Sequence, residues 1–110
     1  MSNSSRIELL LQFVKEEPDN PFNLYALALE YQNTDLKVAA GYFDDLLDKH
    51  PDYLPSYYHA AALFADLEEI EKANQIYIKG IAIAESQNNQ HALRELKNAH
   101  QNFLFENDLD

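Results

Sequence analysis

The sequence predicts an all-α fold of about six antiparallel helices, and three observations support this prediction. Nearly every segment of the 110 residues repeats its apolar side chains with the helical period, and no segment alternates apolar and polar residues as a strand would. The chain has two glycines and no Asn-Gly or Asp-Gly pair of the kind that turns a β-hairpin. Its four prolines stand at the ends of the periodic segments, so the connections are short and neighbouring helices run antiparallel.

The helical period locates six segments, in chain order 5–17, 21–33, 36–49, 55–67, 70–87 and 89–105. The apolar side chains of the first segment share one face and are Ile7, Leu10, Leu11 and Val14. The fifth segment is long and ends at the polar run 86–89. The sixth carries one apolar stripe formed by Leu93, Leu96, Ala99 or His100, Phe103 and Leu104. Its other face is polar, as a helix that ends a stack requires.

Pairs of prolines mark two of the joints between predicted helices. Pro18 and Pro51 each follow a periodic segment, where the proline ring clashes with the preceding turn and ends a helix. Pro21 and Pro55 each begin the next segment, because the fixed φ of proline suits a first helical turn and its missing N–H would be unpaired there. Each pair of prolines therefore predicts a joint between two helices.

The chain also repeats itself at an interval of 34 residues. This shift pairs two sets of residues: Ala39 with Ala73, Phe43 with Tyr77 and Leu46 with Gly80; then Leu24 with Tyr58, Leu27 with Ala61 and Ala28 with Ala62. The first set lies in the second helix of a pair and the other set in the first helix. The repeating unit is therefore a pair of helices.

A two-helix unit of this length, with small or aromatic residues at these offsets, resembles the tetratricopeptide repeat. The first copy matches the pattern of that family at Leu24, Leu27, Ala28, Tyr31, Ala39, Phe43, Leu46 and Pro51. The second copy matches it at Tyr57, Ala60, Ala61, Phe64, Ala73, Tyr77 and Gly80, with Glu85 where the closing proline would stand. The resemblance implies a right-handed α-α superhelix, a TPR-like solenoid.

Two departures from the family pattern concern the turns inside the repeats. The first copy has one residue fewer than usual between Tyr31 and Ala39. In the second copy Glu68 stands at the interhelical turn where the family often has glycine, the residue best suited to a left-handed backbone. Either these turns differ locally from those of the family, or the register is one residue away.

The expected organisation is one domain over 1–110. It consists of a flanking helix over 5–17, repeats over 21–53 and 54–87, a capping helix over 89–105 and a frayed tail over 106–110. The flanking helices are needed because each repeat can bury its second face only against a neighbour.

The resemblance also implies a concave groove lined by the first helix of each repeat. With Leu24 and Tyr57 as fourth positions, the groove residues are Phe22, Tyr25, Leu29, Gln32 and Asn33, then Pro55, Tyr58, Ala62, Ala65 and Asp66. Tyr57 is then expected in the core and Tyr58 in the groove. The alternative is that the groove tyrosines pack against the first or sixth helix and leave little groove.

Charge and composition bear on the partner class. Eight basic and nineteen acidic residues give a formal charge of -11, which disfavours nucleic acid and anionic membrane surfaces. The surplus either favours a basic partner or only keeps the protein soluble. The sequence has no cysteine, no signal-peptide pattern at its start and no apolar run long enough for a membrane span, so a cytoplasmic location is expected.

No motif for chemistry is present. The four histidines form no His-x-x-x-His pair, and the acidic residues lie on or at the start of predicted helices without the glycine of a calcium loop. No phosphate-binding glycine loop and no nucleophile elbow occur. No catalytic residue, metal or cofactor is therefore expected.

These observations predict a non-enzymatic protein–protein interaction module, an adaptor or scaffold that binds a peptide or helix in the groove. The protein would be a monomer or weak homo-oligomer, and its partner is not identified by the sequence. One alternative is a structural or self-associating protein with Phe103, Leu104 or Phe105 at its interface. A small-molecule binder is another, and it would require a deep pocket of convergent polar groups.

Overall fold

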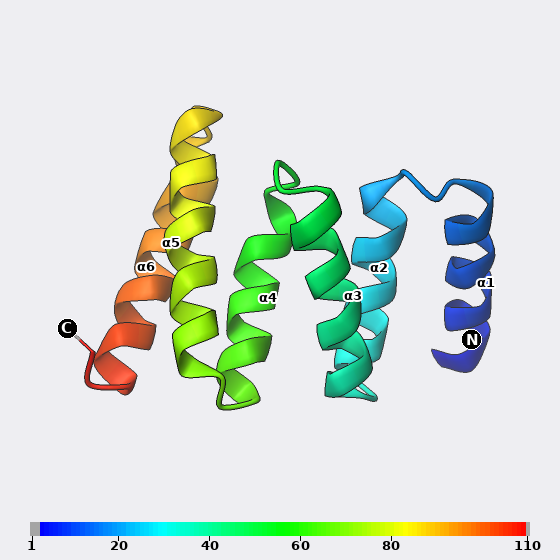
Figure 1. The fold of residues 1–110 in the computed structure, drawn as a ribbon, viewed down its shortest axis with the longest axis horizontal. Helices are drawn as coiled ribbons and strands as arrows, with labels where there is room; N and C mark the ends of the chain where they lie inside the picture. The colour runs from blue at the N-terminus through cyan, green and yellow to red at the C-terminus, as the bar shows by residue number, and fades with distance from the viewer. Residues whose placement is uncertain (1–2, 110) are drawn as a thin grey trace. The chain divides into compact units, whose positions relative to one another are not determined.

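The computed structural model of the protein describes residues 3–109, with side chains from residue 5 onward. The regular structure of this part of the chain consists of six α-helices: α1 (Asn3–Glu16), α2 (Pro21–Gln32), α3 (Leu36–Lys49), α4 (Pro55–Asp66), α5 (Ile70–Ser86) and α6 (Gln90–Glu106) (Figure 1). The predicted all-α class is confirmed, and each helix ends within two residues of its expected boundary. Residues 1, 2 and 110 of the expected domain lie outside the described residues.

The helix starts follow from local chemistry. Pro21 and Pro55 are the first residues of α2 and α4, as their fixed φ predicts. Three helices begin after a side chain that accepts a hydrogen bond from a backbone N–H of the first turn. These bonds join Asn20 Oδ1 to Phe22 N at 3.0 Å, Asp35 Oδ1 to Val38 N at 3.2 Å and Asn89 Oδ1 to Ala92 N at 3.0 Å.

The helices form two compact units. The first unit extends to Tyr53 and contains α1, α2 and α3; the second begins at Leu54 and contains α4, α5 and α6. Within the first unit α2 packs against both α1 and α3, and within the second α5 packs against both α4 and α6. The boundary between the units lies in the joint between Pro51 and Pro55, where the sequence places the border of its two repeats.

Small side chains let the paired helices approach closely. Ala39 of α3 and Ala73 of α5 are fully buried, and so are Phe43 and Tyr57, each less than 2% exposed. At Gly80 of α5 an added Cβ would lie 2.8 Å from the Cβ of Tyr57, closer than such atoms normally approach. The absence of a side chain at Gly80 therefore provides the space that the Tyr57 side chain fills.

Helices α4, α5 and α6 each end in the same type of turn, in which one residue adopts a left-handed backbone. These residues are Glu68 (φ 64°), Asn88 (φ 56°) and Asp108 (φ 56°). After α4, Glu68 N donates to Ala65 O at 3.0 Å and Glu69 N donates to Phe64 O at 2.9 Å. This pattern is a Schellman motif, which usually has glycine at the left-handed position.

The turn after α2 is different. Thr34 N donates to Tyr31 O at 2.9 Å and Asp35 N donates to the same oxygen at 2.6 Å, and Asn33 keeps a right-handed backbone. The shorter spacing between Tyr31 and Ala39 thus goes with a turn that contains no left-handed residue. The first departure therefore corresponds to a local difference in the turn, whereas at Glu68 the turn keeps the left-handed backbone and only the residue type differs.

The end of α6 continues into the segment that the sequence assigns to a tail. Asp108 N donates to Phe105 O at 3.3 Å and Leu109 N donates to Leu104 O at 2.9 Å. These bonds repeat the motif that ends α4 and α5, so residues 107–109 cap the helix.

Replacing Gly80 with alanine should lower the free energy of unfolding, because the new methyl group meets the Tyr57 side chain at 2.8 Å. We expect a loss of about 1–3 kcal/mol. Gly41→Ala is the matched control, since nothing lies within 4 Å of a Cβ added to this exposed helical glycine. That substitution should raise the free energy of unfolding by about 0.5–1 kcal/mol. Urea denaturation followed by circular dichroism measures both changes, and equal effects would contradict the packing at Gly80.

Replacing Glu68 with glycine should raise the free energy of unfolding by about 1 kcal/mol, because glycine adopts the observed φ of 64° without the strain of a Cβ. Glu69→Gly is the control: it removes the same charge from the neighbouring residue, whose φ is −91°. Thermal and urea unfolding of the two variants should show stabilisation in the first alone. A Glu68→Gly variant no more stable than Glu69→Gly would argue against the left-handed turn.

Candidate functional site

The expected binding residues of the first repeat share one face of α2. They are Phe22, Tyr25, Leu29 and Gln32, with Asn33 at the cap, and we call this set the α2 face. Phe22 is 59% exposed, Asn33 is also exposed and the other three are half-buried. Their spacing of three and four residues places them on one side of the helix. The α2 face thus offers one exposed aromatic ring beside mixed polar and apolar side chains.

The expected residues of the second repeat lie on α4. Tyr58, Ala62, Ala65 and Asp66 share a side of this helix, and we call this set the α4 face. Tyr58 is 43% exposed while its neighbour Tyr57 is 1% exposed. The sequence predicts this difference in burial. The remaining expected residue, Pro55, is exposed at the first position of α4.

Tyr25 makes a contact that the sequence does not predict. Its ring packs edge-on against the ring of Tyr53, with centroids 5.7 Å apart. Burial and then the neighbouring Tyr53 raise the pKa of the Tyr25 hydroxyl above its ordinary value. Tyr53 follows Pro51 in the joint at the end of the first unit, so one residue of the α2 face is held by this joint.

On the α4 face, Tyr58 and Asp66 lie near a third polar side chain, the hydroxyl of Tyr77 on α5. Burial is the main cause that raises the pKa of Tyr77, and the charges of Tyr58, Glu106 and Asp66 add to it. Tyr77 is 5% exposed and its ring contacts Phe103 at 5.3 Å between centroids. The sequence assigns Tyr77 to the core, and its hydroxyl also contributes to the electrostatics of this face.

The ring of Tyr58 also meets His59 edge-on, with centroids 5.5 Å apart. His59 is half-buried, and burial lowers the pKa of its imidazole. On α6, burial likewise lowers the pKa of His100, whose Nε2 lies 2.7 Å from Asn74 Oδ1. The second unit therefore contains two imidazoles whose neutral form is favoured by the fold.

The sixth helix differs from its expected role in self-association. Phe103 is 5% exposed and packs against Tyr77, so it belongs to the core of the second unit. Leu104 is half-buried and Phe105 is 75% exposed. Only the last of the three residues named as a possible interface is therefore a surface residue with a large exposed ring. The apolar stripe of a helix cannot by itself show how deeply each residue is covered.

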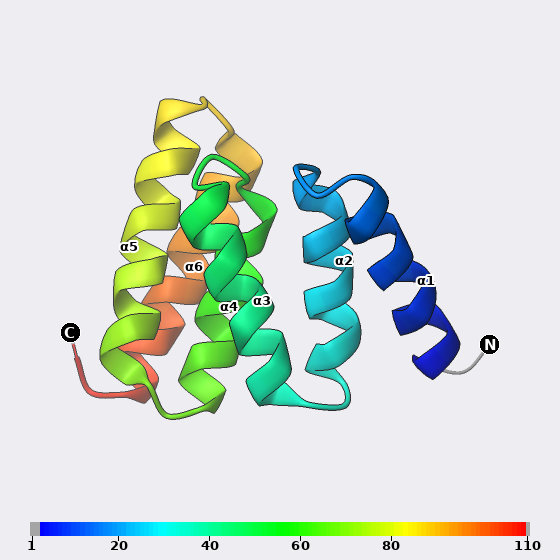
Figure 2. The same cartoon turned by 45° about the vertical axis from the view of Figure 1, so that its right-hand side comes forward.

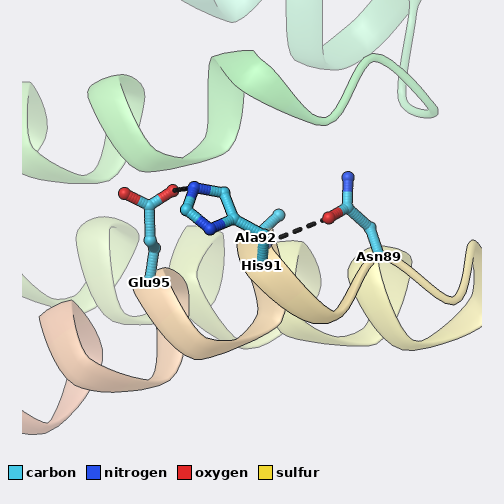
Figure 3. A network of polar contacts seen from close by, with 4 residues as sticks. All are labelled: Asn89, His91, Ala92 and Glu95. Atoms are coloured by element: carbon cyan, nitrogen blue, oxygen red, sulfur yellow. Dashed lines mark hydrogen bonds and ion pairs between the residues drawn. The ribbon is translucent and has the colours of Figure 1, made fainter.

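The polar contacts of the described residues suggest no catalytic arrangement. His91 Nε2 lies 3.1 Å from Glu95 Oε1 on the surface of α6, with side chains 76% and 59% exposed (Figure 3). Among residues 5–109 no three side chains of histidine, aspartate or glutamate are grouped so that they could hold a metal ion. Within the same range no helix combines the length and the apolar character that crossing a membrane requires.

Hollows of ligand-sized volume on the described surface include the following. One, about 580 Å³, is lined by Glu68, Glu69, Ile70, Glu71, Lys72 and Gln75, and Lys72 Nζ lies 4.1 Å above the Phe64 ring. A second, about 350 Å³, is lined by Pro21, Lys49, His50, Pro51, Asp52 and Tyr53. The third, about 370 Å³, is lined by Ile81, Lys97, His100, Gln101, Leu104 and Phe105. Most of these side chains are exposed, whereas small-molecule sites enclose their ligands.

Comparison with solved structures identifies the family. The solution structure of a tetratricopeptide repeat domain protein from Salinibacter ruber is 34% identical with a TM-score of 0.74, over 79% of this chain and 89% of that chain. The crystal structure of a tetratricopeptide repeat domain protein from the same organism is 33% identical with a TM-score of 0.72, over 76% and 96%. This chain belongs to the tetratricopeptide repeat family.

The family assignment explains the fold more fully than any one motif. A tetratricopeptide repeat protein is expected to consist of helix pairs, and α2–α3 and α4–α5 are such pairs. A protein from Bordetella parapertussis shares the fold at 21% identity, with a TM-score of 0.78 over 94% of this chain and 91% of that chain. No protein-family model and no curated protein matches the sequence.

The lowered pKa values of His59 and His100 predict that stability falls as the solution is acidified. Both imidazoles have a folded pKa below the ordinary 6.5, so the unfolded chain binds protons more readily. Their contribution is complete above the unfolded pKa and is lost as the pH falls toward the folded pKa. Urea denaturation between about pH 7.5 and about pH 5.5 should show this loss. A His59→Gln/His100→Gln variant with the same pH dependence as the wild type would contradict it.

Proposed function

We propose that this tetratricopeptide repeat protein is a non-enzymatic protein–protein interaction module, an adaptor or scaffold that binds a peptide or helix. The α2 face and the α4 face are the proposed contact surfaces. The observation that carries this proposal is the exposure of Tyr58 beside the buried Tyr57. The core of the repeat uses one tyrosine for packing, and the next tyrosine is available at the surface.

The exposed rings suit a contact with another protein. Phe22 and Tyr58 are 59% and 43% exposed, so each offers apolar area that a partner can cover. Tyrosine adds a hydroxyl for hydrogen bonding and loses little conformational entropy on binding. With Leu24 and Tyr57 as fourth positions, Tyr25 and Tyr58 occupy the same position in the two repeats, and both belong to the proposed site. A single exposed ring is common on protein surfaces; equivalent aromatic positions on two first helices are the stronger argument.

The charge of the chain indicates the kind of partner. A formal charge of -11 favours a basic peptide or helix, because oppositely charged surfaces associate faster and wrong partners are repelled. The same charge argues against nucleic acid and anionic membranes as partners. We propose a cytoplasmic protein that acts without cofactor or metal, with residues 1–110 as one domain whose repeats span 21–53 and 54–87.

Substituting the two most exposed rings tests the proposed contact surfaces. A Phe22→Ala/Tyr58→Ala variant should bind a partner captured from native lysate at least about 10-fold more weakly, since buried aromatic residues often dominate an interface. The measurement is isothermal titration of the purified partner into each protein. Tyr25→Phe tests the hydroxyl alone, because it keeps the ring that packs against Tyr53.

Ile78→Ala is the control, since Ile78 is 46% exposed on α5 and lies outside both faces. Circular dichroism should show unchanged helicity in every variant. Equal affinity of the wild type and the double variant would reject the α2 and α4 faces as the site and leave the fold unaffected.

A further inference from the structure

The first helix has an apolar flank that no other part of the first unit covers well. Within this unit α1 packs against α2 (Figure 2), and Ile7, Leu10 and Val14 of α1 are half-buried. Leu9 and Phe13 remain 46% and 41% exposed. These two residues are four apart and therefore neighbours on the helix surface. Leu9 and Phe13 thus lie side by side at the surface of a strongly acidic chain. Leu11, which the sequence assigns to the apolar face of this helix, is also 41% exposed.

The position of Phe13 relative to the following proline shows why this exposure is unusual. A shift of 33 residues places Pro18 on Pro51, Phe13 on Leu46 and Leu10 on Phe43. Leu46 of α3 is fully buried. The corresponding Phe13 of α1 has no comparable cover. The helix therefore carries a core-type residue at a position where its own unit does not bury it.

The exposed pair belongs to a longer pattern. Arg6, Leu9, Phe13 and Glu16 follow one another at spacings of three, four and three residues, the spacing of a coiled-coil contact line, and we call this set the α1 seam. Its two central residues are apolar, and its two ends carry opposite charges. Such a line is complementary to itself when it is reversed.

When two α1 seams pack in antiparallel orientation, each residue of one seam faces a complementary residue of the other. Arg6 of one copy then faces Glu16 of the other, and Leu9 of one copy faces Phe13 of the other. A parallel arrangement would place Arg6 against Arg6 and Glu16 against Glu16, which costs energy. The charge pattern therefore selects both the partner and its direction.

We propose that the α1 seam is the contact surface of a weak homodimer, in which two copies of the chain pack α1 against α1 antiparallel about a twofold axis. The ion pair of Arg6 within its own chain is compatible with this role. Arg6 Nε lies 3.0 Å from Glu30 Oε1 while the side chain stays 58% exposed. A guanidinium has five N–H donors in a planar fork, so one bond through Nε leaves donors for a carboxylate of the second copy.

A second molecule of the same protein explains the α1 seam better than an unrelated helix does. Chains with a charge of -11 repel one another at long range, so association requires local complementarity. The α1 seam has one positive and one negative end and therefore adds no net charge at the contact. Because a single pair of short helices buries much less than a standard interface of about 1,600 Å², the dimer should be weak. This inference does not depend on the proposed α2 and α4 faces.

Sedimentation equilibrium from about 10 to about 500 µM tests the surface. The wild type should shift from monomer toward dimer, and Leu9→Lys should remain monomeric throughout. Ile78→Lys is the matched control, because Ile78 and Leu9 are both 46% exposed and the charge change is the same. It should dimerise like the wild type. Dimerisation of Leu9→Lys, or a wild type that stays monomeric, overturns the proposal.

A competing surface is tested in the same experiment. Phe105 on α6 is 75% exposed beside the hollow lined by Ile81 and Lys97. If Phe105→Lys abolishes the dimer and Leu9→Lys does not, the contact lies on the second unit and the α1 seam is rejected. Circular dichroism confirms that each variant keeps its helices, which is expected because the substituted side chains are exposed.

Disulfide exchange tests the direction of packing, since the chain has no cysteine of its own. Leu9→Cys and Phe13→Cys proteins, mixed in equal amounts in a glutathione buffer, should form the mixed disulfide in more than the statistical half of the crosslinked dimers. Ile78→Cys mixed with Leu9→Cys should show no such preference. Enrichment of either homodisulfide would indicate parallel or unspecific packing and overturn the antiparallel arrangement.

Discussion

The close approach of helices at small side chains is the constraint on which the rest of this structure depends. The Tyr57 side chain packs directly against Gly80, and a Cβ added to this glycine would lie 2.8 Å from the Cβ of Tyr57. Ala39 and Ala73 are buried to the same degree in the two units. Because interiors are packed as densely as crystals, these positions fix how near the helices of a pair lie. Once the distance between two helices is set, it also determines which side chains on their facing sides point into the core.

This packing determines which aromatic residues remain for binding. The ring of Tyr57 fills the space above Gly80, so the next residue on α4, Tyr58, points elsewhere and stays 43% exposed. On α2, Leu24 is buried and Phe22 is 59% exposed. Surface and core are thus set by one packing arrangement, and the proposed interaction faces are a consequence of it. Exposed rings on rigid helices lose little freedom when a partner covers them.

The helix ends show that local strain is tolerated where hydrogen bonds compensate for it. Glu68, Asn88 and Asp108 adopt left-handed backbones although none is glycine. Each lies in a Schellman motif whose two hydrogen bonds satisfy carbonyl groups at the end of a helix. The α1 helix presents the opposite situation: its bonds are regular, while Leu9 and Phe13 lack cover. Backbone strain is therefore found at the ends of α4, α5 and α6, and exposed apolar side chains are found on α1.

The sequence alone determined the six helices and their order, because periodicity and proline chemistry act locally. The resemblance to the repeat family added the different burial of Tyr57 and Tyr58. The same resemblance assigned the proposed binding residues to α2 and α4. Only the tertiary structure decided that Tyr25 meets Tyr53, that Phe103 joins the core, and that the flank of α1 stays exposed. A periodic pattern shows which side of a helix is apolar. It carries no information on which distant segment, if any, covers that side.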